Sequence, residues 1–220
     1  MNESKVEIQP NQIDSSVRFQ DTILLTYSIQ YPNTQAPAYP ESAACINRYY
    51  ETETLLYQDY LLRELFHQAA DHYQYSIPGG NPVNAYEAVS RYQITLNASP
   101  LLSLYTDRYE YTGGAHGMTV RRSETWCLPQ CRRLQLSELF PDGFDYRSYL
   151  LAQIAAQIEK APELYFDNPN QNIAVHFQDD HFYCVPGGLV IYYQQYEIAP
   201  YSAGIREFEI PYPAGVTPAC

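Results

Sequence analysis

The sequence predicts an α+β fold with a mainly antiparallel sheet and two principal helices packed on it. Three observations lead to this class. Strand-like segments come in blocks rather than in strict alternation with helices, two stretches carry apolar residues at helical spacing, and short turns join neighbouring strand-like segments. The chain has 220 residues, of which 45% are hydrophobic and 17% are charged, and such a composition is typical of a globular protein. Residues 1–99 and 100–220 are expected to form two halves of one compact unit.

The first half is expected to contain a strand or hairpin, a long helix and a further strand. Residues 17–31 show an alternating pattern rich in β-branched and aromatic residues, which predicts one long strand or a hairpin that ends at Pro32. From Ser42 to Tyr73 the pattern becomes helical, and the turn "SIPGGNP" is expected to end that helix before a strand at residues 84–97. The predicted apolar stripe of the helix consists of Leu55, Leu62, Phe66, Ala69 and Tyr73, with Leu61 and Leu65 beside it.

The second half is expected to contain more strands than helices. After a strand at 101–111, residues 117–127 and 131–136 predict a hairpin closed by "CLPQ". A second helix is predicted from Asp145 to Lys160, where Leu150, Ile154 and Ile158 share one face. A hairpin around Pro186-Gly187-Gly188 and a last strand at "REFEIPY" complete the chain. Both helices are expected on one face of the same sheet, because their stripes need a common apolar surface.

The charge balance limits the classes of partner. The chain has 25 Asp and Glu residues against 13 Lys and Arg residues, a formal net charge of −12. This balance argues against nucleic acid and anionic membrane surfaces, whereas it permits a cationic partner. No run approaches the roughly 20 apolar residues of a membrane span, so no membrane insertion by this chain is expected. The start "MNESKVEIQP" lacks a secretory signal, which predicts a cytoplasmic protein if Met1 is the native start and an extracytoplasmic one if an export signal or anchor was removed.

Five cysteines cannot all pair, and Cys220 is the natural unpaired one. Cys127 and Cys131 flank a predicted turn, where they are expected either to form a hairpin disulfide or to stay reduced. A zinc site that adds His176 and His181 has suitable gaps within each pair, but 44 residues separate the two pairs, far more than in a zinc finger. The expectation is therefore no metal and no cofactor.

The stretch "YTGGAHG", which begins at Tyr111, places His116 among glycines between two predicted strands. His116 could act as a general base with Glu110 as its orienting partner. The favoured interpretation is a structural turn, in which Gly113, Gly114 and Gly117 supply positive φ or close backbone approach. The sequence contains none of the nucleophile-elbow, zinc-protease, P-loop or dinucleotide-binding motifs, which also argues against an enzyme.

The stretch "YYQQYEIAPYSAG", which begins at Tyr192, is dense in tyrosine. Tyrosine combines a large apolar face with a polar tip and suits recognition surfaces and the stacking of carbohydrate rings. Tyr196 and Tyr201 are the expected aromatic anchors. Glu197 is the one carboxylate of the stretch and an alternative partner for His116.

These two stretches resemble the motifs of a known domain family. Two further segments add to the resemblance, "LQLSELFPDG" and "GGLVIYYQQYEIAPYSAGIREFEIPY". The chain resembles a domain family of unknown function found in the extracytoplasmic part of RsiV, a lysozyme-sensing anti-sigma factor, and in the non-catalytic N-terminal region of the peptidoglycan deacetylase PdaC. The resemblance covers about residues 100–213, and residues 17–99 look like the companion N-terminal half. It implies an α+β fold and, in the sensor branch, binding of lysozyme followed by proteolytic release of a sigma factor. The sequence shows no sigma-binding region, membrane helix or deacetylase domain, so neither full activity is carried over.

The sequence therefore predicts a non-enzymatic binding or sensor-type domain that recognises a cell-wall glycan or a cationic wall-active protein such as lysozyme. An alternative is a hydrolase that acts on cell-wall material through His116 with Glu110 or Glu197, and a third interpretation is a stand-alone cytosolic domain. The residues expected to contribute to binding are Glu110, Tyr111, His116, Tyr196, Glu197 and Tyr201.

Overall fold

A computed structural model describes residues 5–76, 79, 84–216 and 220. Within them, nine strands form a six-stranded sheet of order β1-β2-β3-β4-β5-β6 and a three-stranded sheet of order β7-β8-β9. The chain divides into two compact units. The first unit comprises Val6–Tyr92 and Thr106–Thr119, and the second comprises Gln93–Tyr105 and Val120–Cys220 together with Met1–Lys5. Three strands contribute residues to both units: β3 (Tyr86–Ala98), β4 (Leu101–Tyr111) and β5 (Met118–Cys127).

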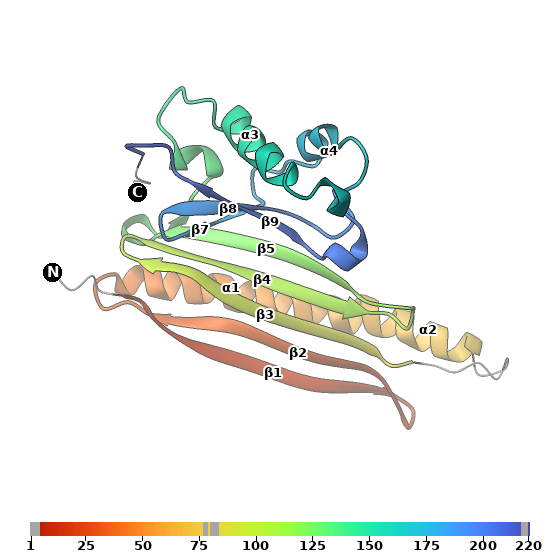
Figure 1. The fold of residues 1–220 in the computed structure, drawn as a ribbon. Coiled ribbons are helices and arrows are strands. Elements are labelled where there is room, and N and C mark those ends of the chain that lie inside the picture. The colour runs from red at the N-terminus through yellow and green to blue at the C-terminus, as the bar shows by residue number, and fades with distance from the viewer. Residues whose placement is uncertain (1–4, 77–78, 80–83, 217–219) are drawn as a thin grey trace. The chain divides into compact units, whose positions relative to one another are not determined.

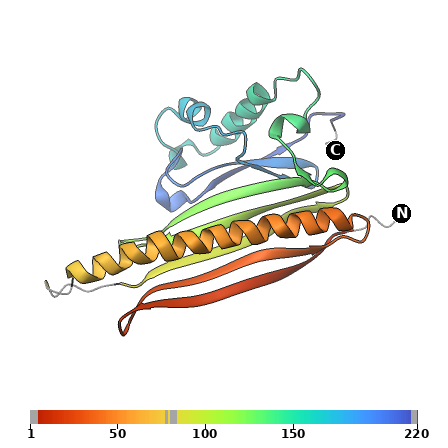
Figure 2. The ribbon, with the colours of Figure 1, turned by 180° about the vertical axis from the view of Figure 1, so that it is seen from behind.

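The first unit consists of a long hairpin and a long helix. β1 (Glu7–Phe19) and β2 (Thr22–Gln35) pair antiparallel, and β2 pairs in parallel with β3 over Leu25–Ile29. The helix is made of α1 (Pro40–Tyr60), a single π-helical turn and α2 (Phe66–Ser76), and it packs on β2, as the two opposite views show (Figure 1, Figure 2). Leu24, Leu25 and Ile29 of β2 meet the buried side of this helix in one apolar cluster.

The predicted end of the first strand at Pro32 is wrong, because β2 continues to Gln35 with Pro32 opposite Pro10. β3 pairs with β2 only over Leu25–Ile29, so the missing N–H of Pro32 removes no hydrogen bond from that ladder. Most of β1 was not predicted from the sequence, and its polar side chains are largely exposed. A strand with neither face deeply buried lacks the alternation that marks a strand in a sequence.

The long helix is confirmed, but its predicted stripe is partly wrong. Leu55 and Leu62 are 56% and 38% exposed, whereas Tyr50 and Tyr57 are buried. The buried side follows a three- or four-residue spacing that includes these tyrosines. It consists of Ala43, Ile46, Tyr50, Thr54, Tyr57, Leu61, Leu65 and Ala69. A tyrosine can occupy a buried position when its hydroxyl has a hydrogen-bond partner, and the Tyr57 hydroxyl donates to Glu110 at 2.9 Å.

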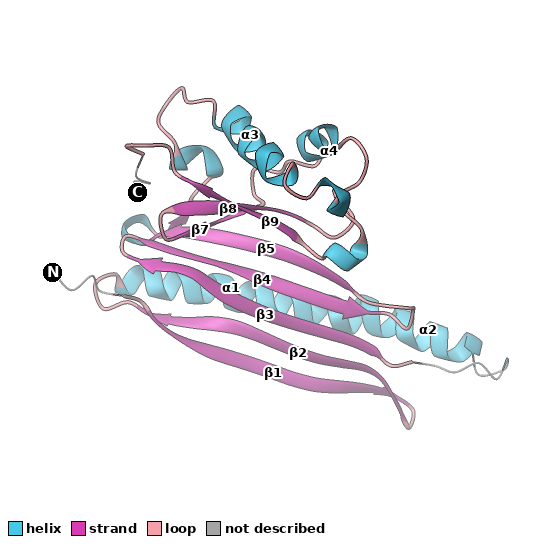
Figure 3. Ribbon diagram, viewed as in Figure 1, coloured by secondary structure: helices cyan, strands magenta, loops and turns pink. Residues whose placement is uncertain are grey.

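The second unit packs helices on the three-stranded sheet (Figure 3). Asp145 accepts a hydrogen bond from the Ser148 N–H at 3.1 Å and caps α3 (Tyr146–Ile158). Leu150, Ile154 and Ile158 of α3 are buried in one cluster with the sheet, as their spacing predicts. α4 was not predicted from the sequence. The elements of this unit are a 3₁₀ turn (Leu128–Gln130), β6 (Arg132–Arg133), α3 (Tyr146–Ile158), α4 (Pro169–Val175), β7 (Phe182–Val185), β8 (Gly188–Tyr193) and β9 (Arg206–Pro211).

The α+β class and the mainly antiparallel pairing are confirmed, since β2 with β3 is the parallel pair among the described pairings. The two helices nevertheless lie on different sheets rather than on one. The long helix packs on β2 and α3 packs on β9, and each belongs to its own buried cluster. Every residue of β8 is buried, so the second sheet must be covered by elements of its own unit, and α3 is one of them.

The turn "SIPGGNP", residues 76–82, lies mostly outside the described residues. Among the helices in the described part of the chain, none combines the length and apolar character needed to cross a membrane.

Candidate functional site

In the first unit, Glu110 is a hydrogen-bond acceptor for the long helix. Its Oε1 accepts from the Tyr57 hydroxyl at 2.9 Å and its Oε2 from the Tyr60 hydroxyl at 3.1 Å. The Arg108 guanidinium lies 4.3 Å from the centre of the Tyr57 ring and 3.6 Å from the Glu53 carboxylate. Burial, and then the Glu110 carboxylate, raise the pKa of Tyr57. Both carboxylate oxygens of Glu110 therefore hold helix and strand together.

The "YTGGAHG" stretch forms a turn between β4 and β5. The exposed His116 has Nδ1 3.1 Å from the carbonyl oxygen of its neighbour Gly117, and the Tyr111 hydroxyl accepts from the Asn84 side chain at 3.2 Å. Gly113 has φ +83°, and a Cβ at Gly117 would lie 2.5 Å from the Glu110 carbonyl oxygen. The role expected for Gly114 is wrong, because its φ is not positive and a Cβ there would meet nothing within 4 Å.

In the second unit, Tyr196, Glu197 and Tyr201 lie on one loop between β8 and β9. The Glu197 carboxylate accepts from the Gln194 N–H at 2.7 Å. Tyr196 has φ +68° and is 48% exposed, and its ring centre is 5.7 Å from that of Tyr201. The loop thus brings the two predicted aromatic anchors together on a backbone that a carboxylate restrains.

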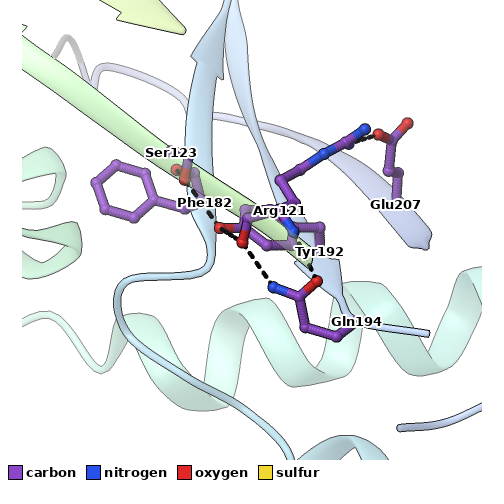
Figure 4. A network of polar contacts seen from close by, with 6 residues as sticks. All are labelled: Arg121, Ser123, Phe182, Tyr192, Gln194 and Glu207. Atoms are coloured by element: carbon purple, nitrogen blue, oxygen red, sulfur yellow. Dashed lines mark hydrogen bonds and ion pairs between the residues drawn. The ribbon is translucent and has the colours of Figure 1, made fainter. Parts of the chain in front are cut away.

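Gln194 fixes the start of this loop, a role that the sequence analysis missed. Its side-chain oxygen accepts from the Arg121 N–H at 3.0 Å, and its side-chain nitrogen donates to the Arg121 carbonyl at 2.7 Å (Figure 4). The amide therefore pairs with β5 as a strand backbone would. No local pattern in the sequence indicates this pairing, because Gln194 and Arg121 are 73 residues apart.

Arg121 and Ser123 extend this network along β5. The buried Arg121 guanidinium pairs with the Glu207 carboxylate and lies 3.6 Å from the centre of the Tyr105 ring. Ser123 Oγ donates to the Phe182 carbonyl oxygen and lies 3.2 Å from the Tyr192 hydroxyl (Figure 4). These contacts join β5, β7, β8 and β9 into one polar network.

Ser123 also lines a cleft of about 550 Å³ that we call the acidic cleft. Its charged side chains are Glu124, Arg133, Asp179 and Asp180, of which both aspartates are exposed. The Tyr146 hydroxyl donates to Asp179 Oδ1 at 3.3 Å. Burial, and then Asp179, raise the pKa of Tyr146. The full lining is Ser123, Glu124, Thr125, Arg133, Leu134, Gln135, Leu136, Ser137, Tyr146, Asp179, Asp180 and Phe182.

The cleft can accept hydrogen bonds from a cation or from several hydroxyl groups. Within the described residues, neither Asp179 nor Asp180 forms an ion pair. Arg133 is the one basic side chain of the lining against three carboxylates, so the cleft as a whole is acidic. This cleft was not predicted from the sequence, because its carboxylates come from distant segments that carry no common motif.

A second cavity of about 930 Å³ lies in the same unit and is mostly apolar. It is bordered by the end of β3, the β7–β8 turn and the segment Tyr212–Val216. None of the predicted binding residues lines it.

The cysteines differ from the sequence prediction. Cys131 is disulfide-bonded, as is Cys45, whereas Cys127 is a buried free thiol, so the expected hairpin disulfide and the fully reduced pair are both wrong. Cys127 lies opposite Arg132 in the ladder rather than opposite Cys131. A bonded Cys131 also cannot supply a thiolate to zinc, and the described residues contain no group of three or more His, Cys, Asp and Glu side chains arranged for a metal. Cys220 is a free thiol, as expected.

Two segments of the chain match models of known protein families. Residues 20–119 match a family model described as deacetylase PdaC, and residues 137–213 match one described as protein of unknown function DUF3298. None of the curated proteins matches the sequence.

Two solved structures share the fold. A DUF3298 family member from Bacteroides fragilis aligns with a TM-score of 0.70 at 20% identity, over 96% of this chain and 92% of that one. A DUF3298 family protein from Pseudomonas aeruginosa aligns with a TM-score of 0.61 at 19% identity, over 94% and 90% of the two chains. The chain thus joins a PdaC-type segment to a DUF3298-type segment, which confirms the resemblance to this domain family of unknown function.

Proposed function

We propose that the chain is a non-enzymatic recognition domain that binds a cationic protein, such as a wall-active protein of lysozyme type, through the acidic cleft. The observation that carries this proposal is the pair of exposed carboxylates, Asp179 and Asp180, which have no ion-pair partner within the described residues. A lysine or arginine side chain of a partner supplies the missing positive charge, and charge-assisted hydrogen bonds are the stronger class.

Two further observations support a cationic ligand. The net charge of −12 attracts a basic partner over a Debye length of about 8 Å at physiological ionic strength. The Tyr146 hydroxyl donates to Asp179, which orients that carboxylate before any ligand arrives and reduces the ordering required on binding.

The contacts of the residues named for the hydrolase alternative favour structural roles. The Glu110 carboxylate accepts from two tyrosines, and the Glu197 carboxylate accepts from the Gln194 N–H. A general base needs its lone pair directed at a substrate proton or at the histidine it orients. Recognition therefore remains the better-supported class.

A cell-wall glycan is a second candidate, and the loop with Tyr196 and Tyr201 favours it. The two rings lie 5.7 Å apart between centres, and Tyr196 is 48% exposed. A sugar ring presents apolar C–H faces that stack on aromatic side chains. The Gln194 and Glu197 hydrogen bonds restrain the loop, as a rigid stacking surface requires.

The test measures binding of lysozyme to the immobilised protein at low and physiological salt. Asp180→Asn removes a cleft charge, and Asp142→Asn removes the same charge from an exposed position outside the cleft lining. The loss of one charge-assisted contact, about 1.5–3 kcal/mol, weakens binding roughly tenfold or more for Asp180→Asn. The control variant is expected to stay within about twofold of the parent. Salt is expected to lower the association rate.

Chito-oligosaccharide is the second ligand in the same assay. If it binds, if Tyr196→Ala abolishes that binding, and if lysozyme does not bind, the glycan candidate replaces the cationic protein. If neither ligand binds at low salt, both candidates are discarded.

A further inference from the structure

The second unit contains two free thiols that lie together, Cys127 at the end of β5 and Cys220, the last residue of the sequence. Cys127 is fully buried in the apolar cluster of this unit, and Cys220 packs against that same cluster. The third free thiol, Cys184, is buried elsewhere on the cluster, where it contacts the Tyr212 hydroxyl at 3.4 Å and the Thr125 hydroxyl at 3.7 Å.

Cys220 lies beside the end of β5. Its Sγ donates to the Pro100 carbonyl oxygen at 3.8 Å, and the N–H of Leu128 donates to that same oxygen at 2.9 Å. Leu128 directly follows Cys127 in the chain. The Cys127 thiol also contributes to the raised pKa of the Cys220 thiol, as a nearby side chain does. A disulfide requires the two Cα atoms to lie within about 7 Å of each other, and the shared contact with Pro100 brings Cys220 to the end of β5 where Cys127 lies.

We propose that Cys127 and Cys220 form a disulfide that the structure shows in its reduced state. The chain already contains disulfide-bonded cysteines, Cys45 and Cys131, so the thiol pair is expected to meet oxidants of the same class. The bond would join the end of β5 to Cys220 within one unit.

The oxidant is a dithiol–disulfide oxidase or a small disulfide such as oxidised glutathione. The half-exposed Cys220 loses its proton, and its sulfur attacks the disulfide of the oxidant, which gives a mixed disulfide and releases one oxidant thiol. Cys127 then loses its proton and attacks the Cys220 sulfur, which displaces the second oxidant sulfur as a thiol. The two protein thiols together lose two protons and two electrons, and the oxidant disulfide gains them.

The surroundings predict that this bond forms slowly. Burial, and then the Cys127 thiol, raise the pKa of Cys220 to about 12, so little thiolate is present at neutral pH. Because the thiolate is the attacking species, formation of the bond is expected to accelerate about tenfold for each unit by which the pH rises, up to the pKa of Cys220.

The test uses the full chain in an oxidised and reduced glutathione buffer. Samples are quenched with N-ethylmaleimide, unfolded, and digested without reduction for peptide mapping by mass spectrometry. The expected result is a linked peptide that contains Cys127 and Cys220, loss of two maleimide adducts, and a melting midpoint higher by about 5 °C or more. Cys184→Ser is the matched control and is expected to form the same link, whereas Cys220→Ser is expected to form none.

Three results would overturn the proposal. The first is full maleimide labelling of Cys127 and Cys220 under conditions that keep Cys131 bonded. The second is a peptide that links Cys127 to Cys131, which would mean exchange within the turn instead. The third is a link from Cys220 to a second copy of the chain, seen as a dimer on a non-reducing gel.

Discussion

Gly117→Ala is expected to destabilise the first unit strongly, whereas Gly114→Ala in the same turn is not. A Cβ at Gly117 would lie 2.5 Å from the Glu110 carbonyl oxygen and would overlap the Tyr109 ring. The ring can rotate, but the carbonyl belongs to β4 and cannot move without breaking strand contacts. Overpacking typically costs 1–3 kcal/mol, and a backbone obstacle puts this variant near the upper end, about 2–3 kcal/mol.

For a chain of this length, about 1 kcal/mol corresponds to roughly 2–4 °C in melting midpoint, so Gly117→Ala is expected to melt about 4–12 °C below the parent. Gly114 has open space around its Cβ position and no positive φ, so alanine there is expected to be neutral or to stabilise by up to about 1 kcal/mol. Differential scanning calorimetry of the three proteins makes the comparison. Equal midpoints for the two variants would refute the assignment of the close approach to Gly117.

Three further predictions concern individual side chains. Gln194→Met removes both side-chain bonds to the Arg121 backbone and is expected to cost about 1–3 kcal/mol, measured by urea unfolding. Glu110→Gln removes a negative charge beside Tyr57 and is expected to lower its pKa, so tyrosinate absorbance appears at lower pH than in the parent. Burial, and then Glu197, raise the pKa of Tyr193 above its ordinary value of 10.0. Above pH 10 the unfolded chain therefore loses this proton first, and this group lowers stability by up to about 1.4 kcal/mol per pH unit. Tyr193→Phe is expected to remove this contribution from the slope in unfolding experiments, while other buried tyrosines such as Tyr57 keep theirs.

The helices and most strands could be predicted because local spacing determines which face is buried. Leu150, Ile154 and Ile158 occupy successive turns of α3, and Asp145 caps it. On the long helix, spacing predicted Leu55 rather than Tyr57 on the buried side, because leucine is apolar whereas tyrosine occurs both buried and exposed. Tyr57 can be buried because its hydroxyl has a hydrogen-bond acceptor. That acceptor is Glu110, which is 53 residues away in the sequence.

The candidate site shows the same limit. Tyr196 and Tyr201 could be predicted as neighbours, since a short loop contains both. The acidic cleft could not, because Glu124 and Asp180 approach each other only through the fold of the second unit. No pattern of nearby residues records that approach, so a single sequence cannot locate the cleft.

The sharing of β3 and β4 between the units bears on how this domain could have arisen and can be exchanged. The PdaC-type match covers residues 20–119, yet Leu101, inside that segment, is buried in the core of the second unit beside residues of the DUF3298-type segment. A genetic crossover between the two matched segments would therefore import a foreign strand into a close-packed core. Such a chimera would need compensating changes around Leu101 before it could fold. The two segments are thus expected to pass between genomes as one inseparable piece, and substitutions at Leu101 are expected to co-vary with those at Leu189 and Ile191 across relatives.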